Sequence, residues 1–393
     1  MRVHPGIGNL GDEQRLMIGS VDKLMDKFDE GYWGKLDREG AYPSDFVQAM
    51  EGHGLGAVPV SKEYGGPGLG AFDSSLILEE INAMGGNSQP FHGQYYLLFA
   101  LQKFASKSLR EKYLPRIAKG ELRLQSLGLT EPEAGSESTR IKTSARRIGD
   151  HYVVKGRKIF ISRIENSDLM VLVARTTPYE KVEKKTEGIT LFLVPLNDVQ
   201  GMKSSRLEMM FNSQTYELFI DELKVPAENV IGEEGKGFRY LLGILNPERI
   251  LLSAECIGDS RWFIQKSVEY AKQRVVFGKP IGSNQGIQFP IAQAYAKLLA
   301  AERVRTTAAE LFDSGAEDRA VGEYANASKF LSSECSWEAA NVAMDVHGGS
   351  GLAVANHIER KFRETRLYRV APVSNNLVLS YLGEHILGLP RSF

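Results

Sequence analysis

The hydrophobic period changes twice along this chain, and that double change limits its fold more than any other feature. In residues 11–120, apolar residues recur three or four apart in segments such as 12–28, 43–54, 72–86 and 95–106. This spacing is typical of amphipathic helices, and glycine-rich turns such as Glu63–Gly68 separate them. From about residue 121, short apolar and β-branched runs punctuated by Gly, Pro, Asp and Asn indicate antiparallel strands.

After Glu233–Gly237 the helical period returns and continues almost to Phe393. Apolar residues from Ile250 to Val275 are spaced alternately by three and four, with one interruption at Arg261. The sequence therefore predicts an α+β fold with a helical domain over 1–120, an antiparallel β domain over 121–232 and a helical domain over 233–393. This order differs from the alternating strand-helix pattern of Rossmann folds, which is therefore disfavoured.

Charge, cysteine content and hydropathy exclude several function classes. Forty-eight Lys plus Arg balance forty-nine Asp plus Glu, so the net charge of −1 provides no overall field for nucleic acid. Two cysteines, Cys256 and Cys335, are too few for a disulfide framework and favour a reducing compartment. The opening residues lack the apolar run of a signal peptide, and no window reaches the ~18 apolar residues of a membrane span. We expect a cytoplasmic protein, or one in a reducing organelle matrix after removal of a targeting peptide.

Five short motifs occur in a fixed order along the chain. They are Glu63–Gly68, Leu129–Ser136 (LTEPEAGS), Gly156–Ser162 (GRKIFIS), Arg274–Gly278 (RVVFG) and His347–Gly351 (HGGSG). Each motif alone is weak, but the five in this order and spacing, within a helix-β-helix chain, resemble the acyl-CoA dehydrogenase family. The resemblance covers nearly the whole chain.

The resemblance implies a fold, a cofactor and partners. It implies that the middle domain is a β-barrel and that the C-terminal domain is a four-helix bundle. FAD is then bound non-covalently between the β domain and the C-terminal helices, in a homodimer or a homotetramer. The implied substrate is an acyl-CoA thioester, and the implied electron acceptor is an electron-transfer flavoprotein. No metal site is expected, because His347 and His357 have no third ligand within reach along the sequence.

A turn after a candidate strand is the first candidate flavin site. Leu129-Thr130 runs into a Pro-Glu-Ala-Gly-Ser turn that exposes backbone N–H groups and a hydroxyl, although a plain turn of small residues explains the same local pattern. A flavin that accepts hydride gains negative charge toward one ring edge, and donors aimed there favour its reduction. By resemblance, the cofactor contacts include Leu127, Leu129, Thr130, Gly135 and Ser136, with Ser136 also near the substrate.

Further cofactor contacts follow from the other motifs. Phe160 and Ser162 stand where the family usually has Trp and Thr, beside the flavin ring. By resemblance, Arg274 and Phe277 reach the adenosine end of FAD across a dimer interface, where a guanidinium pairs with pyrophosphate in a two-pronged geometry. Without the resemblance, Arg274 is a cation in the last turn of a helix. Gly348 and Gly349 allow close approach of backbone to the FAD phosphates. Asp345 stands where a Gln is common, so that contact departs from the family pattern.

Dehydrogenation of a thioester between Cα and Cβ requires a base for the α proton. Many family members carry a glutamate at the position that Pro372 occupies here, and proline cannot act as a base. The isovaleryl-type and long-chain-type branches carry the glutamate just before an arginine, and Glu248-Arg249 reproduces that arrangement. Glu248 is therefore the predicted base, and Arg249 its partner or a substrate contact. The alternative is an ordinary helix start, with Asn246 as N-cap and Pro247 at the first helical position.

Two substrate contacts complete the prediction. In the family, a backbone N–H from the segment around Pro372 polarises the thioester oxygen, and proline offers none. We therefore predict a register shift of one residue that brings the Ala371 amide into place. Tyr95 lies in a helix that lines the acyl cavity in this family, although aromatics at helical spacing are as often plain core.

The activity that these residues indicate is FAD-dependent α,β-dehydrogenation of an acyl-CoA to the trans-2-enoyl-CoA. Two alternatives stay open at the level of sequence. One is a flavin oxidase or oxygenase on the same scaffold, which the missing glutamate at Pro372 favours. The other is a catalytically inactive flavoprotein.

Overall fold

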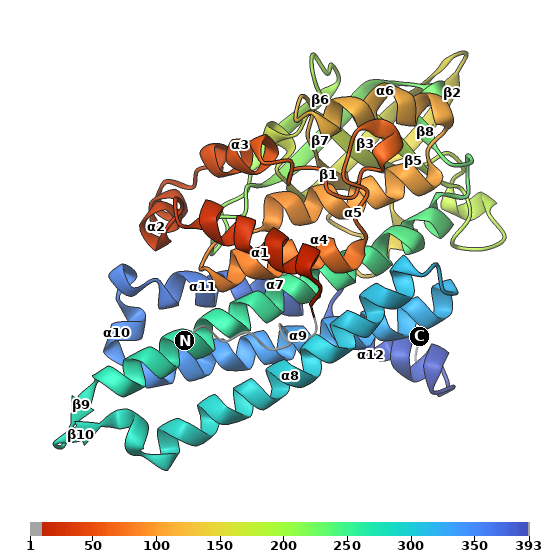
Figure 1. Cartoon of the computed structure of the whole chain (residues 1–393). Helices are drawn as coiled ribbons and strands as arrows, with labels where there is room; N and C mark the ends of the chain where they lie inside the picture. The colour runs from red at the N-terminus through yellow and green to blue at the C-terminus, as the bar shows by residue number, and fades with distance from the viewer. Residues whose placement is uncertain (1–9, 392–393) are drawn as a thin grey trace. The chain divides into compact units, whose positions relative to one another are not determined.

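The computed structural model describes residues 10–391 (Figure 1). The opening segment 1–9, on which the interpretation of the leader depends, lies outside the described residues. Close contacts divide the chain into two compact units. The sheet unit comprises Gly40–Leu69 and Gln89–Glu248, and the helical unit comprises Gly70–Ser88 with the described parts of Met1–Glu39 and Arg249–Phe393. The helices of the first 120 residues are thus shared between the two units.

The sheet unit is built on one eight-stranded sheet. Seven of its strands follow the hydrogen-bonded order β6-β7-β3-β2-β4-β5-β8, and β1 pairs with β4 beside that path. Alternating residues such as Tyr152, Val154, Leu172, Phe192 and Leu218 form its buried core. The strands are β1 (Leu124–Gly128), β2 (Ser144–Ile148), β3 (His151–Ser162), β4 (Leu169–Arg175), β5 (Ile189–Pro195), β6 (Met202–Arg206), β7 (Thr215–Pro226) and β8 (Val230–Ile231).

The prediction of an entirely antiparallel β domain is corrected at two pairings. β1 and β4 run parallel, with Leu127 opposite Val171, and β2 meets β4 in parallel at Ser144 and Arg175. The remaining pairings of this sheet are antiparallel among the described residues. The local pattern could not show this, because β1 enters the sheet directly from a helix rather than through a hairpin. The charged stretch Glu180–Glu187 forms the mostly exposed connection between β4 and β5.

Strand β3 contains a bulge that matters for the site. Lys158 pairs with Leu218, and Ile161 pairs with Tyr216. Between these pairs, two residues of β3 therefore lie opposite one residue of β7. Phe160, inside the bulge, has a φ of 59° and a side chain that is 56% exposed. Left-handed backbone is uncommon for a bulky residue, and bulges often re-aim a side chain next to a functional site.

Four helices belong to the sheet unit or begin in it. Most of α5 is buried, and Gln94 anchors it by donating to the carbonyl of Gly56 at 2.6 Å. Ser106 caps α6 by accepting from the N–H of Leu109. The bounds are α3 (Ser44–Gly52), α5 (Gln89–Phe104), α6 (Lys107–Ala118) and α7 (Gly237–Gln273), of which α7 continues into the helical unit.

The helix α7 continues without a break through residues 246–248, the segment that the sequence also allowed as a helix start. Pro247 lies inside this 37-residue helix. The alternative interpretation, with Asn246 as N-cap and Pro247 at the first helical position, is therefore wrong. Proline lacks the N–H that the carbonyl of Gly243 would otherwise bind, which normally costs about 3 kcal/mol in a helix interior. Glu248 is consequently a mid-helix carboxylate, so helix-end stabilisation does not explain it.

In the helical unit, the two long helices α8 and α9 pack against each other (Figure 1). Small residues such as Ala301 on α8 and Ala339, Ala340 and Ala343 on α9 belong to one buried cluster, which permits close helix packing. The helices are α1 (Asp12–Met25), α2 (Glu30–Glu39), α4 (Ala71–Ala83), the end of α7, α8 (Gln285–Asp313), α9 (Asp318–His347), α10 (Gly349–Leu352), α11 (Ile358–Thr365) and α12 (Asn375–Tyr381). A short hairpin, β9 (Val275–Val276) and β10 (Lys279–Pro280), connects α7 to α8.

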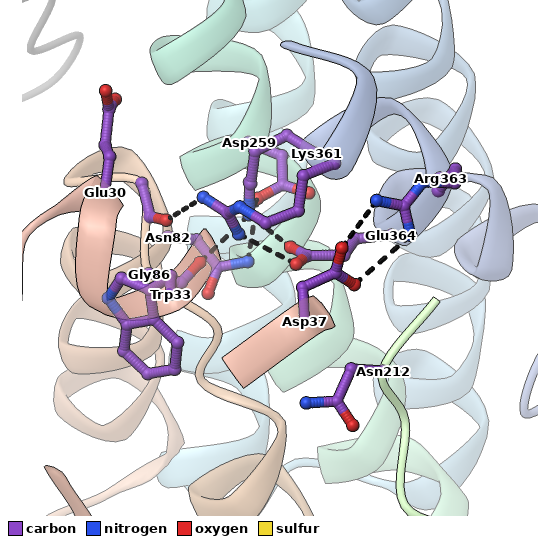
Figure 2. A network of polar contacts seen from close by, with 12 residues as sticks. Glu30, Trp33, Asp37, Asn82, Gly86, Asn212, Asp259, Lys361, Arg363 and Glu364 are labelled. Atoms are coloured by element: carbon purple, nitrogen blue, oxygen red, sulfur yellow. Dashed lines mark hydrogen bonds and ion pairs between the residues drawn. The ribbon is translucent and has the colours of Figure 1, made fainter. Parts of the chain in front are cut away.

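A buried polar network lies inside the helical unit (Figure 2). The Lys361 ammonium lies 2.5 Å from Asp259 and 3.2 Å from Glu364, and it donates to the carbonyl of Gly86 at 3.0 Å. Asn82 donates to Asp259 at 2.9 Å. Lys361 and Asp259 are fully buried. The cation therefore connects α11 to α7 and to the turn after α4, near the carbonyl end of that helix, where a positive charge is favourable.

Arg261 explains the interruption in the apolar stripe of α7. Its guanidinium lies 2.7 Å from Glu79 and 2.9 Å from Glu80 on α4, and all three side chains are buried. The predicted stripe is otherwise buried from Ile250 to Ala271 except at the partly buried Val268, whereas Val275 lies beyond the helix and is exposed. Among residues 10–391, no helix has both the length and the apolar character needed to cross a membrane.

Candidate active site

The turn that follows β1 is fixed by a buried lysine. Lys158 on β3 donates to the carbonyl of Leu129 at 2.9 Å and to Glu131 at 2.8 Å. Glu131 also accepts the N–H groups of Lys142 at 2.5 Å and Thr143 at 2.9 Å. Burial lowers the pKa of Lys158 to about 8. Lys158 belongs to one of the motifs, but the sequence pattern gave no reason to assign it this structural role.

Glu131 makes this turn sensitive to acid. Burial raises the pKa of Glu131, but the Lys158 ammonium and the N–H groups of Lys142 and Thr143 outweigh burial, so the pKa is lowered from 4.5. A lowered carboxyl pKa contributes stability that is complete above pH 4.5 and is lost as pH falls through the folded-state value. We expect Glu131→Gln to cost about 3 kcal/mol of unfolding free energy between pH 5 and pH 7, because Lys158 stays buried without its counter-charge. Urea unfolding should show this difference shrinking below pH 4.5, and a difference that grows there would contradict the assignment.

The structure brings the predicted residues of the β1 turn and the β3 bulge together. The N–H of Ile159 donates to the carbonyl of Thr130 at 2.9 Å. The hydroxyl of Ser126 donates to the carbonyl of Ser162 at 2.8 Å. Phe160 is exposed between these two contacts. Leu127, Leu129, Thr130, Phe160 and Ser162 therefore lie along one pair of neighbouring segments of the sheet unit.

The end of the same turn is open to solvent. Glu131 and Ala134 exchange backbone hydrogen bonds, which closes the turn before Gly135 and Ser136. Gly135 and Ser136 are exposed, and within residues 10–391 neither their N–H groups nor the Ser136 hydroxyl forms a hydrogen bond. Open N–H groups beside a hydroxyl suit a phosphate oxygen.

Four predicted cofactor residues lie on exposed parts of the helical unit. Arg274 follows the end of α7 and is exposed, and Phe277, at the tip of the β9–β10 hairpin, has a φ of 52° and is 100% exposed. Gly348 lies between α9 and α10 and Gly349 begins α10, and an added Cβ at either would meet no atom within 4 Å. Their backbone is accessible to a ligand, as the prediction requires.

Glu248 is buried beside a histidine that the sequence analysis did not single out. Its Oε1 lies 3.1 Å from Nε2 of His92 on α5, and the two residues are 2% and 8% exposed. Its Oε2 is buried and has no hydrogen-bond partner within the described residues. A buried carboxylate oxygen without a partner is costly and calls for an explanation, such as a ligand that it faces.

Gly93 places this pair close to β1. A Cβ on Gly93 would lie 2.8 Å from Nη2 of Arg163 and 3.0 Å from the carbonyl of Gln125. Only glycine therefore permits α5 to approach β1 this closely. His92, the residue before it, is in this way held near the strand that carries Leu127. A glycine inside a helix costs up to about 1 kcal/mol, and that is the sequence signal that could have drawn attention to His92.

The two tyrosines of α5 point to different environments. The Tyr95 hydroxyl donates to the carbonyl of Leu55, and the side chain is fully buried. The ring of Tyr96 packs edge-on against His92 with centroids 5.4 Å apart. Burial, followed by the negative charge of Glu248, raises the pKa of Tyr96. The Glu248 carboxylate thus affects the pKa of Tyr96, whereas the hydroxyl of Tyr95 is hydrogen-bonded to a backbone carbonyl in the core.

The remaining two predicted residues belong to the helical unit. Arg249 follows Glu248 along α7 and is 9% exposed. The N–H of Ala371 donates to the carbonyl of Leu367 at 3.0 Å, so this amide already has a partner. The N–H of Val373 forms no hydrogen bond within the described residues. Residues 10–391 contain no cluster of three His, Cys, Asp or Glu side chains that could hold a metal ion.

Three family models match successive parts of the chain. They are the acyl-CoA dehydrogenase N-terminal domain over residues 11–121, the middle domain over 126–223 and the C-terminal domain over 235–387. The chain is 32% identical to acyl-CoA dehydrogenase fadE12 of Mycobacterium bovis, with 97% of this chain and 98% of the relative covered. The chain belongs to the acyl-CoA dehydrogenase family, and the family resemblance noted in the sequence is confirmed.

Other relatives agree with this class of CH–CH oxidoreductases. The chain is 31% identical to cyclohex-1-ene-1-carbonyl-CoA dehydrogenase of Geobacter metallireducens, covering 96% of this chain and 99% of the relative. The butyryl-CoA dehydrogenase structure from Megasphaera elsdenii superposes with a TM-score of 0.90 at 27% identity, covering 96% and 99% of the two chains. PigA, solved with FAD and proline, shares the fold with a TM-score of 0.89 at 23% identity, covering 97% and 99%. The predicted order of helical, β and helical regions is confirmed.

Proposed function

We propose that this protein is an FAD-dependent dehydrogenase that oxidises an acyl-CoA thioester between Cα and Cβ, with Glu248 as the base. The observation that carries the proposal is the state of the Glu248 carboxylate. One oxygen contacts His92, and the other is buried with no hydrogen-bond partner in the described residues. A base for a C–H proton needs an available carboxylate oxygen that is shielded from water.

The residues of the sheet unit fit a flavin on three observations. The exposed Phe160 on a bulged backbone offers an apolar face, and Thr130 beside it offers a hydroxyl. Gly135 and Ser136 offer unbonded N–H groups, which suit a phosphate. We propose that Leu127, Leu129, Thr130, Phe160 and Ser162 hold the ring. When bound, FAD supplies the acceptor for the β hydride.

The exposed residues of the helical unit keep their predicted roles as proposals. Arg274 is assigned to a pyrophosphate of FAD, for which a guanidinium has the right planar geometry. Phe277, Gly348 and Gly349 are assigned to the same cofactor, and Arg249 to the substrate. An electron-transfer flavoprotein as acceptor, and assembly into a homodimer or homotetramer, are proposed from the family membership.

The thioester oxygen needs a hydrogen-bond donor, and the available amide is at Val373. We predicted the Ala371 amide for this role, but its N–H is bonded to the carbonyl of Leu367. The Val373 N–H has no such partner within residues 10–391. We therefore assign the donor role to Val373 and keep Ala371 as a neighbour of the substrate. A single lost donor of this kind costs about 100- to 1000-fold in rate, so this position matters for activity.

Anaerobic addition of a panel of acyl-CoA thioesters to the FAD-loaded protein tests the proposed function. Bleaching of the flavin absorbance by at least one straight or branched acyl-CoA, with formation of the 2-enoyl product, is the expected result. If no thioester bleaches the flavin, the proposed function is wrong. Admission of air after bleaching separates the alternatives: slow reoxidation agrees with a dehydrogenase, whereas rapid reoxidation with peroxide in proportion to substrate indicates an oxidase.

A further inference from the structure

We infer that His92 is a positioning residue that gives the two oxygens of Glu248 different roles, and this inference rests on the proposed function. His92 holds Oε1, and Oε2 is thereby left as the oxygen that removes the α proton. The relevant geometry is the 3.1 Å contact between His92 Nε2 and Glu248 Oε1, both of them buried. The unpartnered Oε2 is the second, independent observation.

The direction of the hydrogen bond follows from the chemistry of the pair. A base must be ionised, and an ionised carboxylate only accepts hydrogen bonds. The contact therefore requires the proton on Nε2 of His92, which donates to Oε1. A bond to the ionised form also favours that form, which offsets the cost of burying it.

The surroundings restrain the imidazole of His92. The ring of Tyr96, from the next turn of α5, packs edge-on against the imidazole. Arg163 approaches α5 at Gly93, the residue after His92. Tyr96, from α5, and Arg163, from the segment after β3, are titratable or charged groups that lie near the pair. Neither replaces the Nε2 contact, because that contact joins α5 directly to α7.

The proton balance of the step is simple. The C–H bond at Cα breaks, its proton moves to Oε2 of Glu248, and its electron pair stays on the substrate as the enolate. His92 keeps its own proton throughout and changes none of its bonds. Its contribution is orientation, and a displacement of about 1 Å in a reacting group costs about 100-fold in rate.

Two amide variants separate positioning from general packing. The amide nitrogen of glutamine lies at a similar distance along the side chain to Nε2 of histidine, whereas that of asparagine corresponds to Nδ1. We therefore expect His92→Gln to retain the contact with Glu248 and His92→Asn to lose it. Gln102→Leu is the matched control, because Gln102 lies on the same helix but bonds to Ser61 and to the carbonyl of Pro59.

The readout is exchange of the α proton in D₂O with a 3-thiaacyl-CoA, in which sulfur replaces Cβ so that no hydride can leave. We expect His92→Asn to slow exchange by about 100-fold with the dissociation constant of the thioester unchanged. His92→Gln should recover at least tenfold of this loss, and Gln102→Leu should exchange at the wild-type rate. Exchange by His92→Asn at the wild-type rate, or no recovery in His92→Gln, would overturn the inference.

A second readout does not depend on turnover. Thermal unfolding midpoints of wild type, His92→Asn, Glu248→Leu and the double variant form a cycle in which each single variant removes the contact, and a direct bond predicts non-additive shifts. Additive shifts would count against the contact. Glu248→Gln also separates the two levels of the argument. If Glu248→Gln still exchanges the α proton, the proposed base is wrong. If Glu248→Gln does not exchange it and His92→Asn exchanges it at the wild-type rate, Glu248 stays the base and only the role of His92 is wrong.

Discussion

Replacement of Glu248 by Gln should lower the rate of anaerobic flavin bleaching by about two to four orders of magnitude, the usual contribution of a positioned general base. The substitution keeps the size of the side chain and leaves an oxygen that can still accept from His92. It removes the negative charge and therefore the proton acceptor. Binding of FAD should be unchanged, because the residues that we assign to the ring lie on β1, the turn after it and β3.

The matched control for this prediction is Glu255→Gln. Glu255 is another fully buried glutamate of α7, and it accepts from the hydroxyl of Ser88 at 3.0 Å, which is a contact within the helical unit. We expect Glu255→Gln to bleach at close to the wild-type rate. Stopped-flow absorbance measures both variants with the same thioester. Equal rates for Glu248→Gln and wild type would show that another group removes the proton.

The second large effect concerns stability, and it follows from Lys361. We expect Lys361→Met to lower the unfolding free energy by about 3–5 kcal/mol at pH 8, the usual cost of removing one partner of a buried ion pair. Methionine fills much of the same volume, so the loss comes mainly from Asp259, which stays buried without its cation, whereas Glu364 keeps Arg360 at 2.8 Å. Urea unfolding at two pH values measures the effect.

The loss should be smaller at pH 5. Burial raises the pKa of Asp259 to about 7 even with Lys361 present. A folded-state pKa above the unfolded value of 3.8 means that the folded form binds a proton more readily, so stability falls as pH rises through this range. Removal of Lys361 raises the pKa of Asp259 further. At pH 5 the carboxyl can be neutral, and most of the penalty for a buried unpaired charge is avoided.

Lys266→Met is the control for the stability prediction. Lys266 pairs with Glu30 at 2.8 Å, but both side chains are more than a quarter exposed. Partly exposed pairs contribute about 0–1 kcal/mol, and we expect no change in that loss between pH 5 and pH 8. A Lys361→Met variant that behaves like Lys266→Met at both pH values would show that the network in Figure 2 does not depend on this cation.

The position of Glu248 could be predicted from the sequence, but its environment could not. The Glu-Arg dipeptide identifies the residue locally, whereas the partner His92 is 156 residues away and belongs to a different helix. The same limit applies to Lys158 and Glu131, whose contact joins β3 to a turn 27 residues earlier. Hydrophobic period describes which face of an element is buried and contains no information about which polar groups meet.

The hydrophobic period does not predict α2 and α6, helices that contain glycine or proline, residues with low helix propensity. The helix α2 contains Gly31 and Gly34, and α6 contains Pro115. Gly34 has a tertiary reason, because a Cβ there would lie 2.6 Å from the ring of His357. Packing thus overrides local propensity at this position. The long periodic segments, by contrast, correspond to α1, α3, α4 and α5, although α5 begins earlier than the period suggested.

The extra residue in β3 also determines how this strand tolerates changes in length. Before the bulge, even-numbered residues such as Val154 and Lys158 point inward, and after it the odd-numbered Ile161 does. A deletion of Ile159 would remove the bulge and restore regular alternation, with Lys158 and Ile161 still facing inward, but residue 160 would lose its left-handed backbone. Homologues with a gap at residue 159 should therefore lack this bulge, and with it the left-handed backbone that exposes residue 160.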